Sequence, residues 1–468
     1  MAVGQSRPGA TRRHVMRPVA SQGMPGLQRH DHESSDTRIV RVDAVTAGVG
    51  DGRSNPDRDA RFARIAWVLL DWAASGFSTV LITLVVAYFK RVAMPEGGWG
   101  LEADVIWAWT LAVAMLVSAV ITSGSASWAD RSDGHQRAVL VGTLVGAGGL
   151  VALAAVPAAA GGLVVAAVIA ACVGFDLTQV FTGSLLPRIA GSHDADRLSA
   201  QGFAAGYAGG AIALVGATAI VAARDRLGLT MAGSLQAAFL ATAAWWLLFS
   251  VPAACARFGV GVVRGEDGGR SGDVGGFARS LWMAARGGSE RRFLAVLGGA
   301  MLALGAIQTA IAQFTSLAER RFELDGPALV RLVLLVQAVA LPGAVIVGWL
   351  STRFGRRVAS NLCIGGWITV LALACLVRGP GDLHALAVLL ALVLGGAQSL
   401  LRAAVATAAP TGRAGVTFGL LQVGTKLAGF ALGMAFGALL VLTGQPEAGL
   451  LAIALQLAVA WWLLRRMA

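Results

Sequence analysis

Four charged residues lie inside long apolar stretches of this sequence, where a charge is costly and therefore informative. They are Asp71, Asp176, Arg402 and Lys426. Placing a charged side chain at the centre of a membrane-spanning helix costs about 2.5–3.5 kcal/mol on insertion scales, so such residues normally face the interior of a helix bundle. A carboxylate there can bind an amine or carry a proton, and a cation can bind a carboxylate. The alternative for each residue is an interhelical ion pair that only stabilises the fold.

The stretch around Asp71 carries its polar residues on one helical face. Asp71, Ser75 and Ser78 are spaced i, i+4, i+7, and residues with this spacing share a face. We expect this face to line a cavity, with Asp71 and Ser75 binding a substrate or Asp71 carrying a proton.

Asp176 is the second acidic residue inside an apolar stretch. Asp176 and Gln179 share a helical face. Two roles stay open for Asp176. It is either a substrate or coupling residue, or the partner of Arg131 or Arg137 in a nearby loop, a contact that would hold one conformation.

Lys426 lies well inside its apolar stretch, with Gln422 one turn before it. A buried ammonium this deep requires a carboxylate, which Asp71, Asp176 or a bound solute can supply. We therefore expect Gln422 and Lys426 to take part in substrate binding or coupling, with an ion pair that stabilises the fold as the alternative.

Three further residues complete the predicted substrate or coupling set. Gln398 and Arg402 are spaced i, i+4, and Gln308 lies in another apolar stretch. Their side chains are of the kind that lines a polar path. For Arg402, snorkelling towards the membrane surface or structural pairing is the alternative, and for the glutamines it is hydrogen bonding between helices.

Apolar stretches of about 20 residues carry these side chains, the length that crosses a hydrocarbon core of about 30 Å as a helix. Strands are excluded because the segments do not alternate between polar and apolar residues. We predict an all-α integral membrane protein whose twelve transmembrane helices cover residues 65–89, 104–126, 138–157, 162–183, 203–222, 231–251, 293–317, 328–350, 358–377, 384–403, 416–442 and 447–464.

The composition supports the membrane and excludes other classes. The chain is 56% hydrophobic and only 14% charged, whereas soluble domains are about 25% charged. Its net charge of +12 does not indicate nucleic-acid binding, because the basic residues lie in loops and tails between apolar blocks. The sequence contains no metal-ligand spacing, nucleotide-binding motif or catalytic constellation. We expect no cofactor, no metal and no enzymatic activity.

The stretches group into two sets of six. Residues 1–60 are polar and Arg-rich, and we predict a disordered cytoplasmic tail there. A Gly-rich, charged segment at 252–292 predicts a cytoplasmic linker between an N-terminal bundle at 61–251 and a C-terminal bundle at 293–468. Arginines are concentrated in the loops on the side of both termini, which predicts that both termini are cytoplasmic. Two six-helix bundles joined in this way are the layout of the major facilitator fold.

Two short loops carry a family resemblance. SWADRSDGHQR at 127–137 and GWLSTRFGRR at 348–357 both resemble the G-x-L-A-D-R-x-G-R-R signature of major facilitator proteins, at equivalent points of the two halves. The resemblance implies a gate-forming role for the charged residues of these loops. They are Asp130, Arg131, Arg137, Arg353, Arg356 and Arg357.

A closer resemblance covers about residues 65–465. AWVLLDWAASGF at 66–77, RLSAQGFAAGYAGG at 197–210 and GGAQSLLRAAVATAAPTGRAGVTFGLLQVGTKLAGFALG at 395–433 resemble the vacuolar amino-acid effluxer-like, autophagy-related branch of the major facilitators. The chain departs from that pattern at Ala74, at Gly183-Ser184 and around 304–307, where the family has Asn, Asn-Ala and an acidic stretch. These departures put a shared substrate in doubt.

The resemblance implies alternating access by two rocking bundles and export of a small solute, with amino acids as one candidate class and protons as a candidate coupling ion. The predicted partners are the lipid bilayer and the solute, and the predicted location is the inner (plasma) membrane of a bacterium, crossed many times. The rival function is a solute sensor or assembly partner that keeps the transporter fold without transport.

Overall fold

The structure is a computed structural model, and it describes residues 56–191, 194–259, 288–322 and 326–465. Within these residues, twelve helices are long and apolar enough to cross a membrane. Each overlaps one predicted stretch, which confirms the predicted all-α membrane architecture.

Six spans form the first part of the fold, called the N-half below. The first span is α1 followed by two π-helical turns, Leu81–Val85 and Phe89–Ala93, on either side of the short α2. The helices are α1 (Pro56–Val80), α2 (Val86–Tyr88), α3 (Ala103–Ser132), α4 (His135–Ala155), α5 (Gly161–Ile189), α6 (Ala195–Ala222) and α7 (Met231–Cys255).

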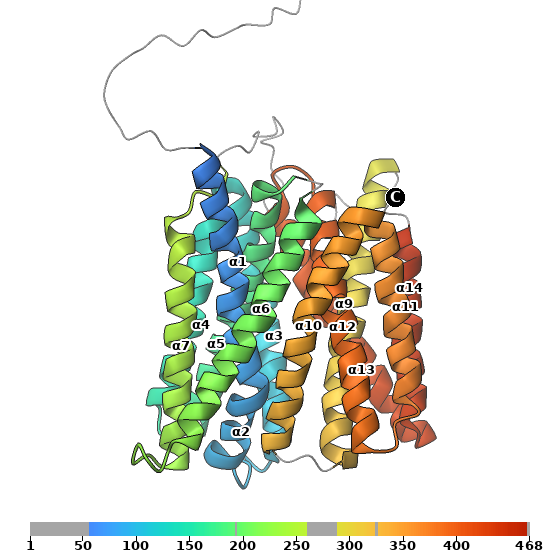
Figure 1. Ribbon diagram of the computed structural model, residues 1–468. Coiled ribbons are helices and arrows are strands. Elements are labelled where there is room, and N and C mark those ends of the chain that lie inside the picture. The colour runs from blue at the N-terminus through green and yellow to red at the C-terminus, as the bar shows by residue number, and fades with distance from the viewer. Residues whose placement is uncertain (1–55, 192–193, 260–287, 323–325, 466–468) are drawn as a thin grey trace, which may run out of the picture. The chain divides into compact units, whose positions relative to one another are not determined.

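Six further spans form the C-half. The helices are α9 (Gly288–Phe322), α10 (Gly326–Phe354), α11 (Arg356–Ala374), α12 (Pro380–Ala408), α13 (Ala414–Thr443) and α14 (Pro446–Leu464). α1 begins and α14 ends at the same end of the bundle (Figure 1), and we call this end the terminal side and the opposite end the far side.

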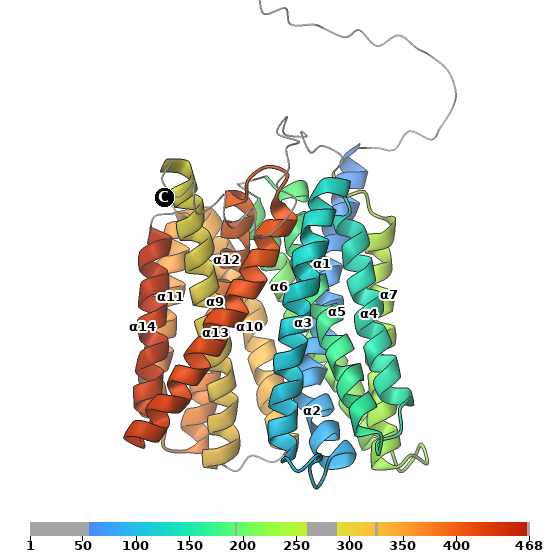
Figure 2. The same cartoon turned by 180° about the vertical axis from the view of Figure 1, so that it is seen from behind.

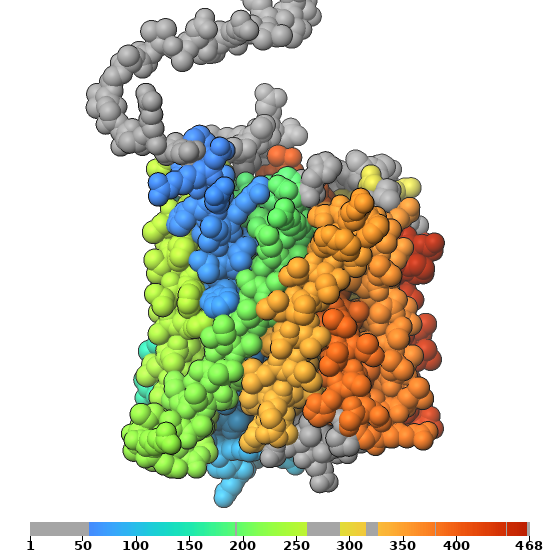
Figure 3. Space-filling model, viewed as in Figure 1, coloured from blue at the N-terminus to red at the C-terminus, as the bar shows by residue number. Residues whose placement is uncertain are grey.

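The two halves lie next to each other with their helices roughly aligned (Figures 1 and 2). Two sets of helices make the contact between them: α6 packs against α10 and α12, and α13 packs against α3 and α5. The space-filling view shows α6 and α10 in contact along the front of the molecule (Figure 3). Side chains on these helices therefore decide how the halves are held together.

Glycines on α6 bring it close to α1. A Cβ atom added at Gly209 would lie 2.4 Å from the carbonyl oxygen of Trp72, and one at Gly202 would lie 2.3 Å from a carboxylate oxygen of Asp71. Real Cβ atoms do not approach other atoms this closely, so larger residues would push the helices apart. The glycine-rich stretch of α6 thus places the Asp71 carboxylate at the surface where α6 meets the C-half.

The outer surface of the bundle is strongly apolar. Side chains such as Leu116, Val120, Val441 and Leu442 are 68–85% exposed, while the buried interior holds the large side chains Trp67, Trp246 and Trp367. Such a surface is stable in contact with lipid, whereas exposing it to water is unfavourable.

The predicted domain boundaries remain predictions. α1 begins at Pro56, before the predicted limit of 61, and α7 ends at Cys255, after the predicted limit of 251. α9 begins at Gly288, before the predicted start of the second bundle at 293. Most of the predicted tail and most of the predicted linker lie outside the described residues.

Candidate functional site

Four charged contacts join the N-half to the C-half. In each one the N-half contributes an aspartate and the C-half contributes a positive group. The contacts are Asp71 with Arg402, Asp176 with Lys426, Asp196 with Arg356, and Asp130 with the N-terminus of α13. We call them the cross-half contacts.

The contact between Asp71 and Arg402 is enclosed on all sides. The guanidinium Nη1 lies 2.7 Å from Oδ2 and 3.0 Å from Oδ1 of Asp71, which is 5% exposed. Nε and Nη2 donate to the hydroxyl and the carbonyl of Ser199 on α6, both at 3.0 Å. The guanidinium also stacks over the rings of Trp67 and Phe203, 4.6 and 4.3 Å from their centroids. A charge-assisted fork with aromatic stacking fixes the arginine firmly.

The contact between Asp176 and Lys426 has fewer partners. The ammonium pairs with Oδ2 of Asp176, which is 5% exposed, and Gln422 donates to Oδ1 at 3.0 Å. The lysine side chain is 18% exposed, more than that of Arg402 at 11%. Lys426 lies about three turns inside α13, so this contact lies deeper in the bundle than the other three.

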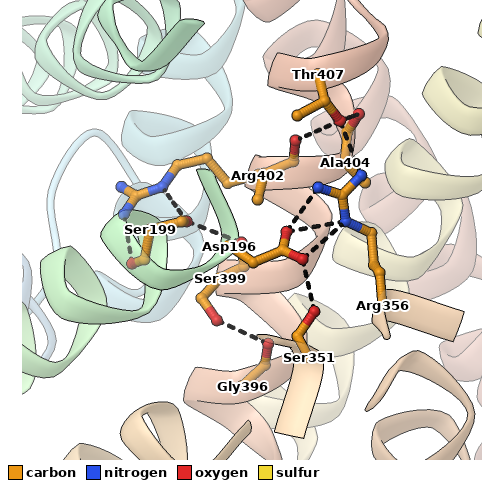
Figure 4. A network of polar contacts seen from close by, with 10 residues as sticks. Asp196, Ser199, Ser351, Arg356, Gly396, Ser399, Arg402, Ala404 and Thr407 are labelled. Carbon is orange, nitrogen blue, oxygen red and sulfur yellow. Dashed lines mark hydrogen bonds and ion pairs between the residues drawn. The ribbon is translucent and has the colours of Figure 1, made fainter. Parts of the chain in front are cut away.

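Asp196, at the start of α6, makes the third contact (Figure 4). Its Oδ1 lies 2.7 Å from Nη2 of Arg356, and the arginine Nε donates to the same oxygen at 2.9 Å. The hydroxyl of Ser351 on α10 donates to Oδ2 at 2.6 Å. Arg356 also donates to Thr407 on α12 at 2.8 Å. The carboxylate thus ties α6 to α10 and α11 directly, and to α12 through Arg356.

Asp130 makes the fourth contact with backbone amides. Its two oxygens accept hydrogen bonds from the amides of Gly415 and Val416, both at 2.8 Å. These amides belong to the first turn of α13, where a helix carries a partial positive charge of about +0.5 and has unpaired N–H groups. The carboxylate therefore caps a helix that belongs to the other half.

The inward face of α13 carries two of the four contacts, those with Asp130 and Asp176. A Cβ atom at Gly419 would lie 3.4 Å from Cβ of Ala126 on α3, so α13 packs closely against the N-half. Gly183 on α5 has no side chain, and a Cβ there would lie 2.5 Å from the ring of Phe418. Residues 415, 419, 422 and 426 share a helical face. This face carries the Gly415 amide that binds Asp130, the close approach of Gly419 to α3, and the side chains of Gln422 and Lys426.

One expected pairing is wrong. The loop arginines Arg131 and Arg137 are exposed, and the acid proposed as their partner, Asp176, is paired with Lys426. The physical reason is depth, because Asp176 lies more than three turns inside α5, whereas the two arginines lie at helix ends.

The charged residues of the second predicted loop, 348–357, also differ in their contacts. Arg356 crosses to the other half, whereas Arg357 donates to the carbonyl of Arg465 within the C-half at 3.2 Å. Arg353 is exposed, and its guanidinium lies 5.9 Å from the ring centroid of its neighbour Phe354.

The remaining candidates differ in their surroundings. Ser75, one turn after Asp71, faces Gly206 on α6 within the N-half. Gln398 accepts a hydrogen bond from the hydroxyl of Tyr207 at 3.3 Å and so joins the halves. Gln179 is half-buried and Gln308 is exposed.

Sequence reasoning missed several residues of the cross-half contacts. Asp196 and Ser199 precede the predicted span 203–222, so they were not considered as intramembrane groups. His135 was read as a loop residue, yet it is 1% exposed and lies 3.2 Å from Asp130. The sequence signal for Asp196 is its place one residue before the RLSAQGFAAGYAGG stretch.

A metal centre has no support within the described parts of the chain, where no cluster of three or more histidine, cysteine, aspartate or glutamate side chains is found. The site is therefore a set of ion pairs and hydrogen bonds between two helical halves.

Comparisons with known proteins identify the family of the chain. The sequence model of the family described as "Vacuole effluxer Atg22 like" matches residues 98–467. The chain is 24% identical over 385 residues to the uncharacterized MFS-type transporter YxiO of Bacillus subtilis (strain 168), covering 82% of this chain and 89% of that protein.

Solved structures share the fold. The major facilitator transporter FucP in its outward conformation matches with a TM-score of 0.67 at 15% identity, covering 88% of this chain and 100% of that one. The human organic anion transporter MFSD10 matches with a TM-score of 0.59 at 15% identity, covering 88% and 100%. The chain therefore belongs to the Atg22-like vacuole effluxer family and is a multi-pass membrane transporter of the major facilitator superfamily.

Proposed function

We propose that this transporter moves a small solute by alternating access and that the cross-half contacts close its terminal side. The observation that carries the proposal is that all four contacts join one half to the other. If the halves rock apart on the terminal side, all four must separate, and they re-form when that side closes. Charges buried in a bundle are costly, and a cycle that uses them gives a reason for their presence.

We propose different roles for the two deepest contacts. Arg402 is fixed by Asp71, Ser199 and two aromatic rings, so it suits a structural lock. Lys426 has one carboxylate partner and more exposure, so it suits exchange with a solute or a proton. The substrate or coupling role thus moves from Asp71 to the group formed by Asp176, Gln422 and Lys426.

The arrangement of charge favours a solute that carries both signs. Asp176 belongs to the N-half and Lys426 belongs to the C-half. A solute ammonium can replace the lysine at Asp176, and a solute carboxylate can replace the aspartate at Lys426. Amino acids and related metabolites meet this requirement, and the "vacuole effluxer" description of the family agrees with efflux.

Protons are the proposed coupling ion, because a lysine and an aspartate that separate can each exchange a proton. The arginine bias of the loops supports a bacterial inner membrane with both termini in the cytoplasm. In that orientation the terminal side is the cytoplasmic side. A sensor without transport is not favoured, since the matched family and the bacterial relative are described as an effluxer and a transporter.

The test is solute flux in proteoliposomes. Purified protein is first screened by thermal stabilisation against amino acids, peptides, sugars and lipophilic cations, and the best ligand is then followed as radiolabelled flux with and without a proton gradient. K426A and D176N are expected to reduce flux at least about tenfold, as for loss of a contact worth about 1.4 kcal/mol or more.

The matched control is K90A. Lys90 is the only other lysine of the chain, and it pairs with the exposed Asp104 within the N-half. K90A is expected to retain flux. Equal flux in K426A, D176N and the unmodified protein would remove this group from the mechanism, and absence of flux for every class of solute would count against transport of these classes.

A further inference from the structure

A cavity on the terminal side of the C-half is lined by three arginines, two of which the proposed cycle does not use. It has a volume of about 290 Å³ and lies where the first turn of α11 meets the end of α14, two helices that pack side by side (Figures 1 and 2). Arg356, Arg357 and Arg465 contribute to its wall, together with Trp461. Among the described residues, no aspartate or glutamate lines it. We call it the α11–α14 cavity.

Two of the three guanidiniums at this cavity have no acidic partner. Arg356 is paired with Asp196. Arg357 donates to the backbone carbonyl of Arg465 at 3.2 Å, and the guanidinium of Arg465 lies over the ring of Trp461, 4.5 Å from its centroid. Within the part of the chain that the structure describes, neither Arg357 nor Arg465 forms an ion pair. The hydrogen bond and the stacking thus hold two uncompensated positive charges at one cavity.

The α11–α14 cavity also offers donors that carry no full charge. The first turn of α11 forms part of its wall, and Gly355, the N-cap residue, has no side chain to bind the free amides of that turn. A helix N-terminus carries about +0.5 of a charge and attracts anions. The hydroxyl of Ser360 lines the cavity as well. Guanidinium groups bind phosphate oxygens in pairs, so the whole set of donors suits a phosphate.

The depth of the cavity corresponds to the headgroup layer of a membrane. α11 has 19 residues and the apolar part of α14 has 18, so each helix is about 27–28 Å long, close to the thickness of the hydrocarbon core. Arg357 at the start of α11 and Arg465 at the end of α14 therefore lie at the membrane surface. Trp461, whose indole N–H donates to Asn361 at 2.7 Å, has the amphipathic ring typical of this layer.

Apolar side chains border the cavity on the outer surface of the bundle. Val358 and Leu362 on α11 are 44% and 56% exposed, and they follow directly after the lining residues Arg357 and Asn361. Their i, i+4 spacing puts them on one helical face. An acyl chain attached to a phosphate in the cavity has this apolar face to lie along, whereas a free phosphorylated solute has no use for it.

We propose that the α11–α14 cavity binds the headgroup of an anionic phospholipid, with Arg357 and Arg465 at the phosphodiester and the acyl chains along Val358 and Leu362. A zwitterionic headgroup carries an ammonium group close to its phosphate, and two unpaired guanidiniums repel that group. A lipid without it, such as phosphatidylglycerol, is therefore the favoured ligand. The cavity lies within the C-half, so binding requires no movement of the halves and does not rest on the proposed transport cycle.

The experiment measures lipid binding to the purified, delipidated full-length protein in detergent by native mass spectrometry. Dioleoyl phosphatidylglycerol is titrated, and dioleoyl phosphatidylcholine is titrated in parallel as a phosphodiester that carries an ammonium group. The Kd of the first bound molecule is compared between the two lipids. Phosphatidylglycerol is expected to bind about tenfold more tightly. Glycerol 3-phosphate, a headgroup without chains, is not expected to displace it at millimolar concentration.

Two double variants locate the binding site. An arginine near an anionic lipid surface contributes about fivefold in affinity, so R357Q/R465Q is expected to weaken phosphatidylglycerol binding about 25-fold. The matched control is R137Q/R353Q, which removes the same charge from two exposed terminal-side positions that do not line the cavity, and it is expected to bind like the unmodified protein. If R357Q/R465Q does not fold, as judged by its melting temperature, the single variants R357Q and R465Q are each expected to lose about fivefold.

Unchanged phosphatidylglycerol affinity in R357Q/R465Q, or in both single variants, overturns the proposal. An equal loss in R137Q/R353Q also overturns it, because the effect would then follow the overall charge of the terminal side. Equal affinity for phosphatidylcholine contradicts the preference for an anionic headgroup. Displacement of the lipid by glycerol 3-phosphate would identify the ligand as a free phosphorylated solute. Since the measurement needs no flux, its outcome is independent of the transport proposal.

Discussion

At the scale of single residues, the two deepest cross-half contacts show why arginine and lysine are not interchangeable. Arg402 uses its planar fork to reach Asp71 and both oxygens of Ser199. Lys426 is a compact cation on a flexible stem, with a single carboxylate partner. The first chemistry suits a contact that locks the closed state, and the second suits a contact in which a solute replaces one of the partners.

Removing the carboxylate of Asp71 tests the structural contact. D71N leaves Arg402 without its anion, and breaking a buried pair from one side costs about 3–5 kcal/mol. We expect the melting temperature to fall clearly and the terminal side to open, while the protein still inserts into the membrane. Thermal unfolding in detergent followed by intrinsic fluorescence measures the change.

The control for D71N is a pair at the surface. D104N removes the carboxylate that pairs with Lys90. The side chain of Asp104 is 73% exposed, and pairs at the surface contribute about 0–1 kcal/mol. The double variant D71N/R402M removes both charges and is expected to recover part of the lost stability. A D71N melting temperature equal to that of D104N would contradict the structural role.

At the scale of helices, the sequence predicted the elements well and their mutual arrangement poorly. Apolar length alone identifies a membrane span, because a bilayer demands about 20 apolar residues, and all twelve spans were found. The sequence offered Asp71, Asp176 or a bound solute as the partner of Lys426, and in the structure the partner is Asp176. The choice among the three depends on the rotation and depth of α5 relative to α13, which no local pattern encodes. Asp196 was not predicted because α6 begins at Ala195, well before the predicted span that starts at 203.

One departure from the family pattern receives a physical explanation. Gly183-Ser184 stands where the family has Asn-Ala. Gly183 leaves room for the ring of Phe418 on α13, and the Ser184 hydroxyl meets the buried imidazole of His135. The departure therefore concerns how α5 and α13 approach each other on the terminal side.

A methyl group at Gly183 tests this helix contact. The Cβ of G183A would lie 2.5 Å from the Phe418 ring, and overpacking a tight contact costs about 1–3 kcal/mol. This exceeds the gain of about 0.5–1 kcal/mol from replacing a helical glycine by alanine. We expect α13 to move away from α5 and the terminal side to open. The distance between spin labels at S132C on the end of α3 and T352C on the end of α10, both exposed positions, measures the opening.

The control is G148A on α4, where a Cβ meets open space and only the helix-propensity gain applies. The smaller side chain of F418L should relieve the clash in the double variant G183A/F418L. If G183A behaves like G148A, the close approach of α5 and α13 does not control opening.

At the scale of the molecule, the halves have opposite charge at their shared surface. The N-half contributes the four aspartates, and the C-half contributes Arg356, Arg402, Lys426 and the positive end of α13. Opposite charges that face each other guide the halves into one register when they close. An open terminal side would present a solute with an acidic wall and a basic wall.

Charge reversal tests this complementarity between the halves. R356E places a second carboxylate against Asp196, whose side chain is 10% exposed, and like charges at a partly buried contact cost on the order of 3 kcal/mol. We expect the single variant to open the terminal side. The double variant D196R/R356E restores opposite signs and should close it again in part, although Ser351 and Thr407 then lose their present partners. Label distances and solute flux together decide the outcome. A double variant as open as R356E would mean that the geometry around Arg356 matters and the opposite charge of the halves does not.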